Sequence, residues 1–207
     1  MNWKEALRGH GCRLRYITRF SNCRRNHNES VAEHSYYVTY YAMLIAHQLT
    51  TTQLIAEHKL EQIIDWKTLY ESCILHDFEE ALTGDIPRTF KYSNQSLFDQ
   101  LEVAAKEALQ RVLQPLKLPQ FLQQHITHTW KHAKNVDTCE GIIVKLADFV
   151  SVLSYMYQEL EAGNLSIVEH QESILEYFTG FKAYPIIAPI LSEIEPIVHE
   201  LLKTKKV

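Results

Sequence analysis

The sequence lacks the features that would indicate a membrane-spanning or a secreted protein, and it has few glycines and prolines. The 207 residues include only six glycines and six prolines, and most of these fall between long stretches with helical periodicity. No stretch approaches the roughly 18 apolar residues that suggest a membrane-spanning helix. The first residues, MNWKEALRGHGCRLRY, contain no apolar run and no cleavage site, so we expect no signal peptide. These absences favour a cytoplasmic protein without a membrane partner.

Cysteine pairs and a basic excess are absent too. The four cysteines form no CxxC pair, which favours reduced thiols in the cytoplasm over a disulfide framework. The formal net charge of −4 gives no basic surface for nucleic acid, so we expect no nucleic-acid partner. A small anionic substrate would therefore need a local positive site, supplied by a metal ion or a few arginines.

The residues that are present indicate a helical protein. Hydrophobic residues make up 46% and charged residues 22%, which is typical of a globular chain, and we expect one domain over residues 1–207. No segment alternates as a strand does. Apolar residues at three- and four-residue spacing predict helices over 30–49, 66–76, 96–113, 119–132, 139–162, 166–178 and 186–203. The prediction is an all-α fold of about seven to nine helices.

Two helix boundaries can also be predicted. We expect Ser93 or Ser96 to cap the helix over 96–113, since serine side chains accept the free N–H groups of a first turn. Gly163 and Asn164 should end the helix over 139–162, because both residues tolerate the left-handed backbone of a helix stop.

Four polar residues fall on helix faces that are otherwise apolar. His34 shares a face with Val31 and Val38, and Asp148 lies one turn from Val144 and from Val152. His76 follows Leu69 and Cys73 on one face, and Asp77 comes next. A buried unpaired carboxylate costs several kcal/mol, so it is normally paired, hydrogen-bonded or bound to a metal. Each residue alone has a simpler explanation as a cap, an ion-pair partner or a satisfied core residue.

Taken together, the four residues indicate a metal site. Two imidazoles and two carboxylates suit a borderline divalent ion such as Mn, Fe, Co, Ni or Zn. Adjacent residues on a helix point about 100° apart, so His76 and Asp77 reach one ion only where the helix ends or bends. The following Glu79-Glu80 and the segment 83–87, TGDIP, are typical of such an interruption. Gly84 should adopt the positive φ of the turn before Asp85.

Three segments resemble the HD-domain phosphohydrolase superfamily, and within it the bacterial 5′-deoxynucleotidase group, the YfbR-like proteins. They are RFSNCRRNHNESVAEHS (19–35), LHDFEEALTGDIPRTFKY (75–92) and KLADFVSVL (145–153). A His-Asp dipeptide alone means little, whereas the joint pattern of the three segments is specific. The resemblance extends from near the N-terminus to about residue 153, and the C-terminal helices match in length only.

The resemblance implies a role for each matching residue. His34, His76, Asp77 and Asp148 would be the metal ligands. Glu80 would lie beside the metal-bound water, so that Glu80 and Asp77 form the catalytic pair. Arg19 would meet the substrate phosphate, Asp85 would bind substrate, and Glu33 accompanies His34. Ser30 stands where the family has Asn, and should still cap its helix. Phe20 stands where the family has Trp, which puts the discrimination of deoxyribose from ribose in doubt.

The activity that the resemblance implies is hydrolysis of deoxyribonucleoside 5′-monophosphates by a homodimer. We expect one divalent ion per subunit, Co or Mn more readily than Mg, with Zn, Fe and Ni also suited to the ligands. A metal ion lowers the pKa of its bound water and polarises the phosphoryl oxygens. Glu80 would then hold or deprotonate the water, and Arg19 would contact the phosphate.

Two alternatives fit the same ligands. One is another HD-type nucleotide phosphohydrolase, with cyclic dinucleotides, guanosine tetraphosphate or triphosphates as substrate. The other is a regulatory metal-binding HD module without activity.

Other histidines and basic residues are open to two interpretations. His125, His128 and His132 share a helical face, so they form a second metal site or else His128 and His132 line or neighbour the pocket. Arg24 and Arg25 are either a solvated pair or a positive mouth for the pocket.

Overall fold

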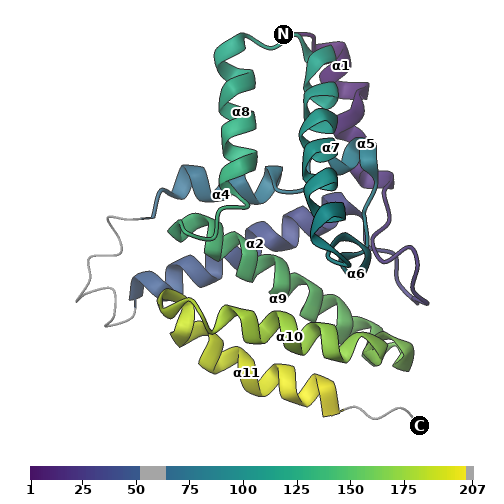
Figure 1. The fold of residues 1–207 in the computed structure, drawn as a ribbon, viewed down its shortest axis with the longest axis vertical. Helices are drawn as coiled ribbons and strands as arrows, with labels where there is room; N and C mark the ends of the chain where they lie inside the picture. Colours follow the sequence, from purple (N-terminus) through teal and green to yellow (C-terminus); the bar gives the residue numbers. More distant parts are fainter. Residues whose placement is uncertain (52–63, 204–207) are drawn as a thin grey trace.

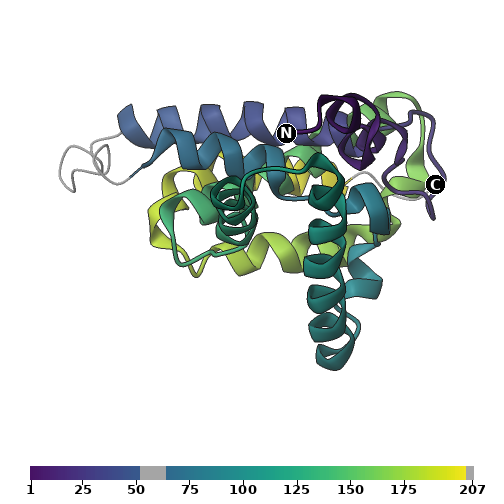
Figure 2. The same cartoon turned by 90° about the horizontal axis from the view of Figure 1, so that it is seen from above.

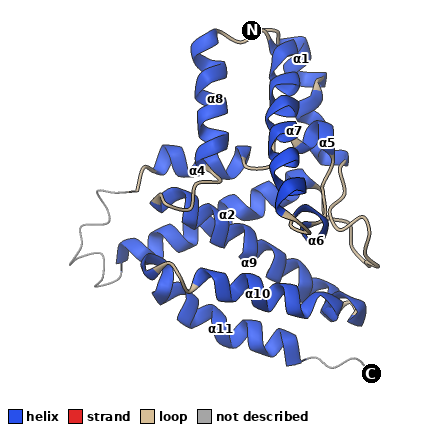
Figure 3. Cartoon of the chain, viewed as in Figure 1, coloured by secondary structure: helices blue, strands red, loops and turns tan. Residues whose placement is uncertain are grey.

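The computed structural model describes residues 1–51 and 64–203, and in these residues all regular elements are helices (Figure 3). The sole β-bridge among them joins Thr18 to Ser30. The helices of ten or more residues are α2 (Val31–Thr51), α4 (Trp66–Leu75), α7 (Gln95–Leu113), α8 (Gln120–His132), α9 (Cys139–Glu161), α10 (Gln171–Phe181) and α11 (Ala188–Lys203). These correspond to the seven helices predicted from periodicity, and the all-α prediction is confirmed.

The short elements were not predicted, because one or two turns show no periodicity. They are the α-helices α1 (Trp3–Arg8), α5 (Glu80–Thr83) and α6 (Arg88–Lys91), and the 3₁₀ helices η1 (His10–Tyr16), η3 (Gln114–Leu116), η4 (Leu165–His170) and η5 (Pro185–Ile187).

The core forms where α2 packs against α9 and α4 (Figure 1). Val38 and Leu49 of α2 and Ile143 and Leu146 of α9 are fully buried within one apolar cluster. Figure 2 shows α2 running along one edge of the molecule. Since α2 and α9 carry two of the expected ligands, His34 and Asp148, the packing of these helices fixes their separation.

Helix α10 packs on α9 through a cluster of aromatic rings. Phe149 of α9 lies 5.2 Å from the ring of Tyr177, 6.0 Å from Phe178 and 5.5 Å from Phe181, measured between centroids. Such edge and tilted pairs are favourable ring arrangements. The cluster therefore brings the C-terminal part of the chain beside the helix that carries Asp148.

The predicted interruption after His76 is confirmed. Helix α4 ends at Leu75, His76 is its C-cap, and α5 begins at Glu80. Glu79 fixes the turn against α8 and the residues that follow it. Its carboxylate accepts hydrogen bonds from Trp130 Nε1 at 2.6 Å and Lys134 Nζ at 2.9 Å. Gly84 then has φ 74°, the left-handed conformation that glycine adopts without a steric cost.

Ser30 and Glu33 cap α2 reciprocally. The Ser30 hydroxyl accepts from Glu33 N at 3.2 Å, and the Glu33 carboxylate accepts from Ser30 N at 2.7 Å. This is a capping box, so Ser30 serves as a cap as predicted. Glu33 is exposed and takes part in capping α2.

Two predicted helix starts are wrong. The cap of α7 is Asn94 rather than Ser93 or Ser96, because Asn94 Oδ1 accepts the N–H of Leu97 at 2.9 Å. The helix expected from residue 166 begins as the 3₁₀ helix η4, and α10 starts only at Gln171. Asn164 caps the start of this segment, since its Oδ1 accepts from both the backbone N–H and the hydroxyl of Ser166. The helix stop at Gly163, with φ 81°, is confirmed.

Candidate metal centre and substrate cavity

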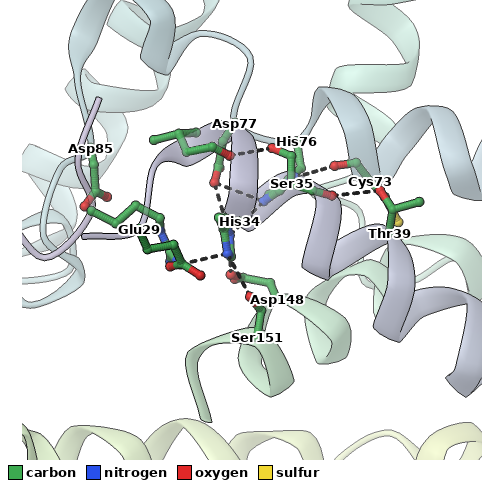
Figure 4. A network of polar contacts seen from close by, with 12 residues as sticks. Glu29, His34, Ser35, Thr39, Cys73, His76, Asp77, Asp85, Asp148 and Ser151 are labelled. Atoms are coloured by element: carbon green, nitrogen blue, oxygen red, sulfur yellow. Dashed lines mark hydrogen bonds and ion pairs between the residues drawn. The ribbon is translucent and has the colours of Figure 1, made fainter. Parts of the chain in front are cut away.

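Four side chains from three parts of the fold converge on one point (Figure 4). His34 Nε2 of α2 lies 3.2 Å from Asp148 Oδ1 of α9 and 3.6 Å from Asp77 Oδ2. His76 Nε2, at the end of α4, lies 2.9 Å from Asp77 Oδ2 and 3.2 Å from His34 Nε2. Donor atoms of His34, His76 and Asp77 all lie within 4.8 Å of one another. The structure therefore brings together all four residues that the sequence suggested as ligands.

The protonation of this cluster is strongly perturbed. Burial, and then the Arg19 charge, lower the pKa of His34 to about 4. Burial also acts to lower the pKa of His76, but the Asp77 carboxylate outweighs it and the pKa rises to about 9. The pKa values of Asp77 and Asp148 are lowered because the imidazoles offset the cost of burial. The imidazoles thus stabilise two buried carboxylates, at a point where a divalent cation would do so more strongly.

The second nitrogen of each imidazole has a partner that orients the ring. Cys73 O lies 2.7 Å from His76 Nδ1, and because a carbonyl only accepts, Nδ1 carries hydrogen and Nε2 faces the cluster. His34 Nδ1 contacts Ser151 Oγ at 3.1 Å and Arg19 Nη1 at 2.7 Å. Such outer contacts hold metal-binding histidines in place. The donor set, its spacing and these contacts fit a divalent ion.

Arg19 lies against the cluster in a buried ion pair. Its Nη1 donates to Glu29 Oε2 at 2.7 Å, and both side chains are almost fully buried. The Arg19 guanidinium carbon also lies 5.0 Å from the centroid of the Phe20 ring. Glu29 was missed in the sequence because no periodic pattern marks it. Its carboxylate holds the guanidinium beside the metal centre.

Glu80 and Asp85 face the same space. The Oε2 atom of Glu80 is buried and has no hydrogen-bond partner among the described residues. Burial, with the charges of Asp77 and Asp85, raises the pKa of Glu80 well above its usual range. Asp85 Oδ2 accepts a hydrogen bond from Phe20 N at 3.1 Å. A buried carboxylate oxygen without a partner beside a metal cluster is suited to hold a water molecule.

These residues open onto a cavity of about 440 Å³, a volume typical of small-molecule sites. One end carries the metal cluster with Arg19, Glu80 and Asp85. An apolar wall is formed by Phe20, Val152, Met156, Ile167 and Ile174. A third region is basic and aromatic, and consists of Arg88, Lys91, Tyr92, Lys134, Lys145 and Tyr177.

The basic and aromatic region was missed in the sequence. Tyr177 of α10 places its hydroxyl 3.5 Å from Asp148 Oδ2, at the long end for a hydrogen bond. The guanidinium carbon of Arg88 lies 3.7 Å from the centroid of the Tyr177 ring. The only signal in the sequence was the position of Arg88 and Lys145 inside the matching segments.

The other histidines do not assemble into a second site. His125 Nε2 contacts Glu71 Oε2 at 2.7 Å, His132 Nε2 lies 3.6 Å from Glu140 Oε2, and the His128 and His132 rings are 6.3 Å apart. In residues 1–51 and 64–203, the group of three or more donors close enough for a metal is that of His34. Neither His128 nor His132 lines the cavity, but Ala133 and Lys134, which follow His132 directly, do, so His132 neighbours the pocket.

Arg25 has a structural contact of its own, since it donates to Phe20 O at 3.1 Å and to Asn28 Oδ1 at 2.9 Å. Neither Arg24 nor Arg25 lines the cavity. The interpretation of this pair as a positive mouth stays a prediction, and Arg25 braces the loop that carries Phe20.

The fold is shared with an HD-domain phosphohydrolase of known structure. A crystal structure of an HD-domain phosphohydrolase from Listeria innocua superposes with a TM-score of 0.76 at 24% identity, over 99% of this chain and 94% of that chain. The crystal structure of a protein from Pyrococcus horikoshii superposes with a TM-score of 0.69 at 17% identity, over 99% of this chain and 100% of that chain.

More narrowly, the chain belongs to the YfbR-like 5′-deoxynucleotidase family, whose model matches residues 10–196. It is 31% identical to a 5′-deoxynucleotidase of Pectobacterium atrosepticum over 155 residues, which are 75% of this chain and 73% of the relative. A 5′-deoxynucleotidase of Photorhabdus laumondii is 29% identical over 75% of this chain and 74% of its own length. The predictions of the family and of a metal-dependent phosphohydrolase are confirmed. In the described residues no helix is long and apolar enough to span a membrane.

Proposed function

We propose that this chain hydrolyses deoxyribonucleoside 5′-monophosphates to a deoxynucleoside and phosphate. The observation that carries the proposal is that His76, Asp77 and Asp148 line one cavity together with Glu80 and Arg19, and that His34 completes the cluster behind them. The names of the bacterial relatives point to the same substrate class. We further propose one divalent ion per subunit, Co or Mn most readily, with Zn, Fe or Ni also compatible with the ligands.

Each residue has a distinct task in this proposal. His34, His76, Asp77 and Asp148 hold the ion, which when bound polarises the phosphoryl group and makes hydroxide available near neutral pH. Glu80 holds the attacking water through its unpartnered oxygen and takes up its proton.

Arg19 neutralises the charge that develops on the equatorial phosphoryl oxygens. Its guanidinium contacts His34 Nδ1, which must carry a proton when Nε2 binds a metal. With a proton on Nδ1, His34 would donate to Ser151 Oγ rather than accept from Arg19, and one Nη1 hydrogen would be available to the phosphate while the other stays with Glu29.

Phe20 shapes the part of the cavity that would hold the nucleoside. Its ring stacks on Tyr155 with centroids 4.6 Å apart and planes within 7° of each other. Together with Val152 and Met156 the stack gives an apolar wall next to Asp85, which we assign to a polar group of the nucleoside. Preference for deoxyribose over ribose stays a prediction.

The test is phosphate release by protein loaded with Co or Mn, measured on all deoxyribonucleoside and ribonucleoside 5′-monophosphates. Deoxyribonucleotide turnover that depends on the added metal supports the proposal, and no release from any monophosphate overturns it. Turnover of cyclic dinucleotides, guanosine tetraphosphate or triphosphates alone would favour another HD phosphohydrolase. Metal binding without turnover of any of these would favour a regulatory module.

We also propose that residues 1–207 act as one domain in a cytoplasmic homodimer. Tyr36, Tyr40 and Leu44 follow one another at four-residue spacing on α2 and are 67%, 42% and 45% exposed. An exposed apolar stripe of this kind is typical of a protein interface. A monomeric mass in light scattering would contradict the dimer.

A further inference from the structure

The cavity contains two cations that make no direct salt bridge, although Glu102 of the same lining acts on one of them, Lys145, at longer range. Lys91 pairs with Glu102 at 2.9 Å, and Lys134 pairs with Glu79 at 2.9 Å. Arg88 of α6 and Lys145 of α9 line the same region, yet neither has a salt bridge with any described residue. A charge that faces a cavity without a counterion is a binding group for an anion.

Arg88 is held in an orientation that suits a planar anion contact. Its guanidinium carbon lies 3.7 Å from the ring centroid of Tyr177 and 4.4 Å from that of Tyr92. Stacking on rings satisfies the face of a guanidinium and leaves its N–H edge available. That edge matches two phosphate oxygens in a bidentate contact.

Lys145 belongs to the same subsite. Its Nζ lies 5.6 Å from the centroid of the Tyr177 ring. Lys145 also precedes Asp148 by three positions on α9, so the two side chains share a face of the helix. Tyr177 therefore contacts both cations through its ring and the metal ligand Asp148 through its hydroxyl, at 3.5 Å.

The two cations are separate from the charges of the metal end. There, Arg19 is paired with Glu29, and Asp77 and Asp148 surround the imidazoles. A scissile phosphate bound at that end leaves Arg88 and Lys145 without an anion. A second phosphate group on the same ligand would reach them.

We propose that Arg88 and Lys145 form a second phosphate subsite, which lets the cavity bind nucleotides that carry two phosphate groups, such as nucleoside 3′,5′-bisphosphates. The proposal rests on the proposed function, since it places the scissile phosphate at the metal end. The shared chemistry is a phosphate dianion, and free inorganic phosphate is the other source of it.

Calorimetry on metal-free protein tests the subsite without turnover. We expect 2′-deoxyadenosine 3′,5′-bisphosphate to bind more tightly than dAMP, and Arg88→Ala or Lys145→Ala to reduce this advantage about tenfold, as loss of a hydrogen bond between charged groups does. In metal-loaded protein the ratio of kcat/KM for bisphosphate over monophosphate should fall by a similar factor. Arg111→Ala removes an exposed arginine of α7 that does not line this cavity, and should leave both ratios unchanged.

The outcomes distinguish a second nucleotide phosphate from free inorganic phosphate, and they test the subsite separately from the proposed function. Weaker inhibition by inorganic phosphate in Arg88→Ala, with an unchanged bisphosphate ratio, would assign the subsite to free phosphate. Ratios and phosphate inhibition all within twofold of wild type would overturn the subsite. Tight bisphosphate binding that depends on Arg88, in a protein that hydrolyses no monophosphate, would retain the subsite and reject the proposed function.

Discussion

Glu159 does not line the cavity, but its replacement should disturb the cavity clearly through the loop that follows Phe20. Its fully buried carboxylate accepts hydrogen bonds from Asn26 N at 2.8 Å, His27 N at 2.7 Å and Asn164 Nδ2 at 2.6 Å. It thereby fastens the loop after Phe20 to the end of α9. We predict that Glu159→Gln loosens this loop.

The size of the effect follows from the contacts. Glutamine keeps one acceptor oxygen and turns the other into an NH₂ group, which would face an N–H donor. Loss of a charge-assisted hydrogen bond, with a buried N–H left unpaired, costs about 2–4 kcal/mol. In a chain of this size that corresponds to roughly 5–15 °C in Tm. We also expect KM for the monophosphate to rise more than kcat falls, because the loop begins at Arg19 and Phe20.

The pH dependence gives an independent signature. Although burial opposes it, hydrogen bonds from Asn164, Asn26 and His27 lower the pKa of Glu159 below its ordinary 4.5. A depressed carboxyl pKa contributes stability that is present above the unfolded value and lost as the pH falls through the folded value. The difference in unfolding free energy between wild type and Glu159→Gln should therefore be largest above about pH 5 and shrink in more acidic buffer.

Urea unfolding between pH 3 and pH 8 measures this difference. Glu161→Gln is the matched control, since Glu161 is exposed two residues further along α9. Surface substitutions without structural effect usually change the unfolding free energy by no more than about 0.5 kcal/mol. If the unfolding free energy of Glu159→Gln at pH 7 lies within that range of wild type, the loop is not held by this carboxylate.

Three further changes test the metal centre. Glu80→Gln should lower kcat about 10²–10⁴-fold with bound metal unchanged, since it removes the proton acceptor; a smaller drop than tenfold would exclude Glu80 from that role. His76→Ala should abolish the bound metal measured by elemental analysis, and an unchanged metal content would place the ion elsewhere. Ser151→Ala should weaken metal affinity about 10–100-fold in a chelator competition, because His34 Nδ1 loses the Ser151 hydroxyl, whereas Ser154→Ala on the same helix should not.

The metal centre was predictable because its residues break a local pattern. His34 and Asp148 interrupt apolar faces, and helix periodicity alone places such residues toward the core. The turn after His76 was predictable as well, since adjacent ligands cannot face one point from a straight helix.

The remainder depends on packing between distant elements. Tyr177 reaches Asp148 only because Phe149 docks α10 onto α9, and Glu159 reaches the loop at Asn26 across 133 positions. No spacing rule within one helix contains that information. The cap of α7 was misassigned for a different reason, since Ser93, Asn94 and Ser96 are all competent caps and only the backbone decides among them.

The backbone at Phe20 has a consequence for how this cavity can change. Phe20 has φ 53°, a left-handed conformation that is costly for a bulky residue, and its N–H and C=O bind Asp85 and Arg25. Asp85 and the loop are thus anchored by main-chain atoms that any residue except proline provides. The ring at position 20, which contacts Tyr155 and Arg19, can change while these main-chain hydrogen bonds persist. Substrate preference and the integrity of the catalytic scaffold can therefore evolve independently at a single position.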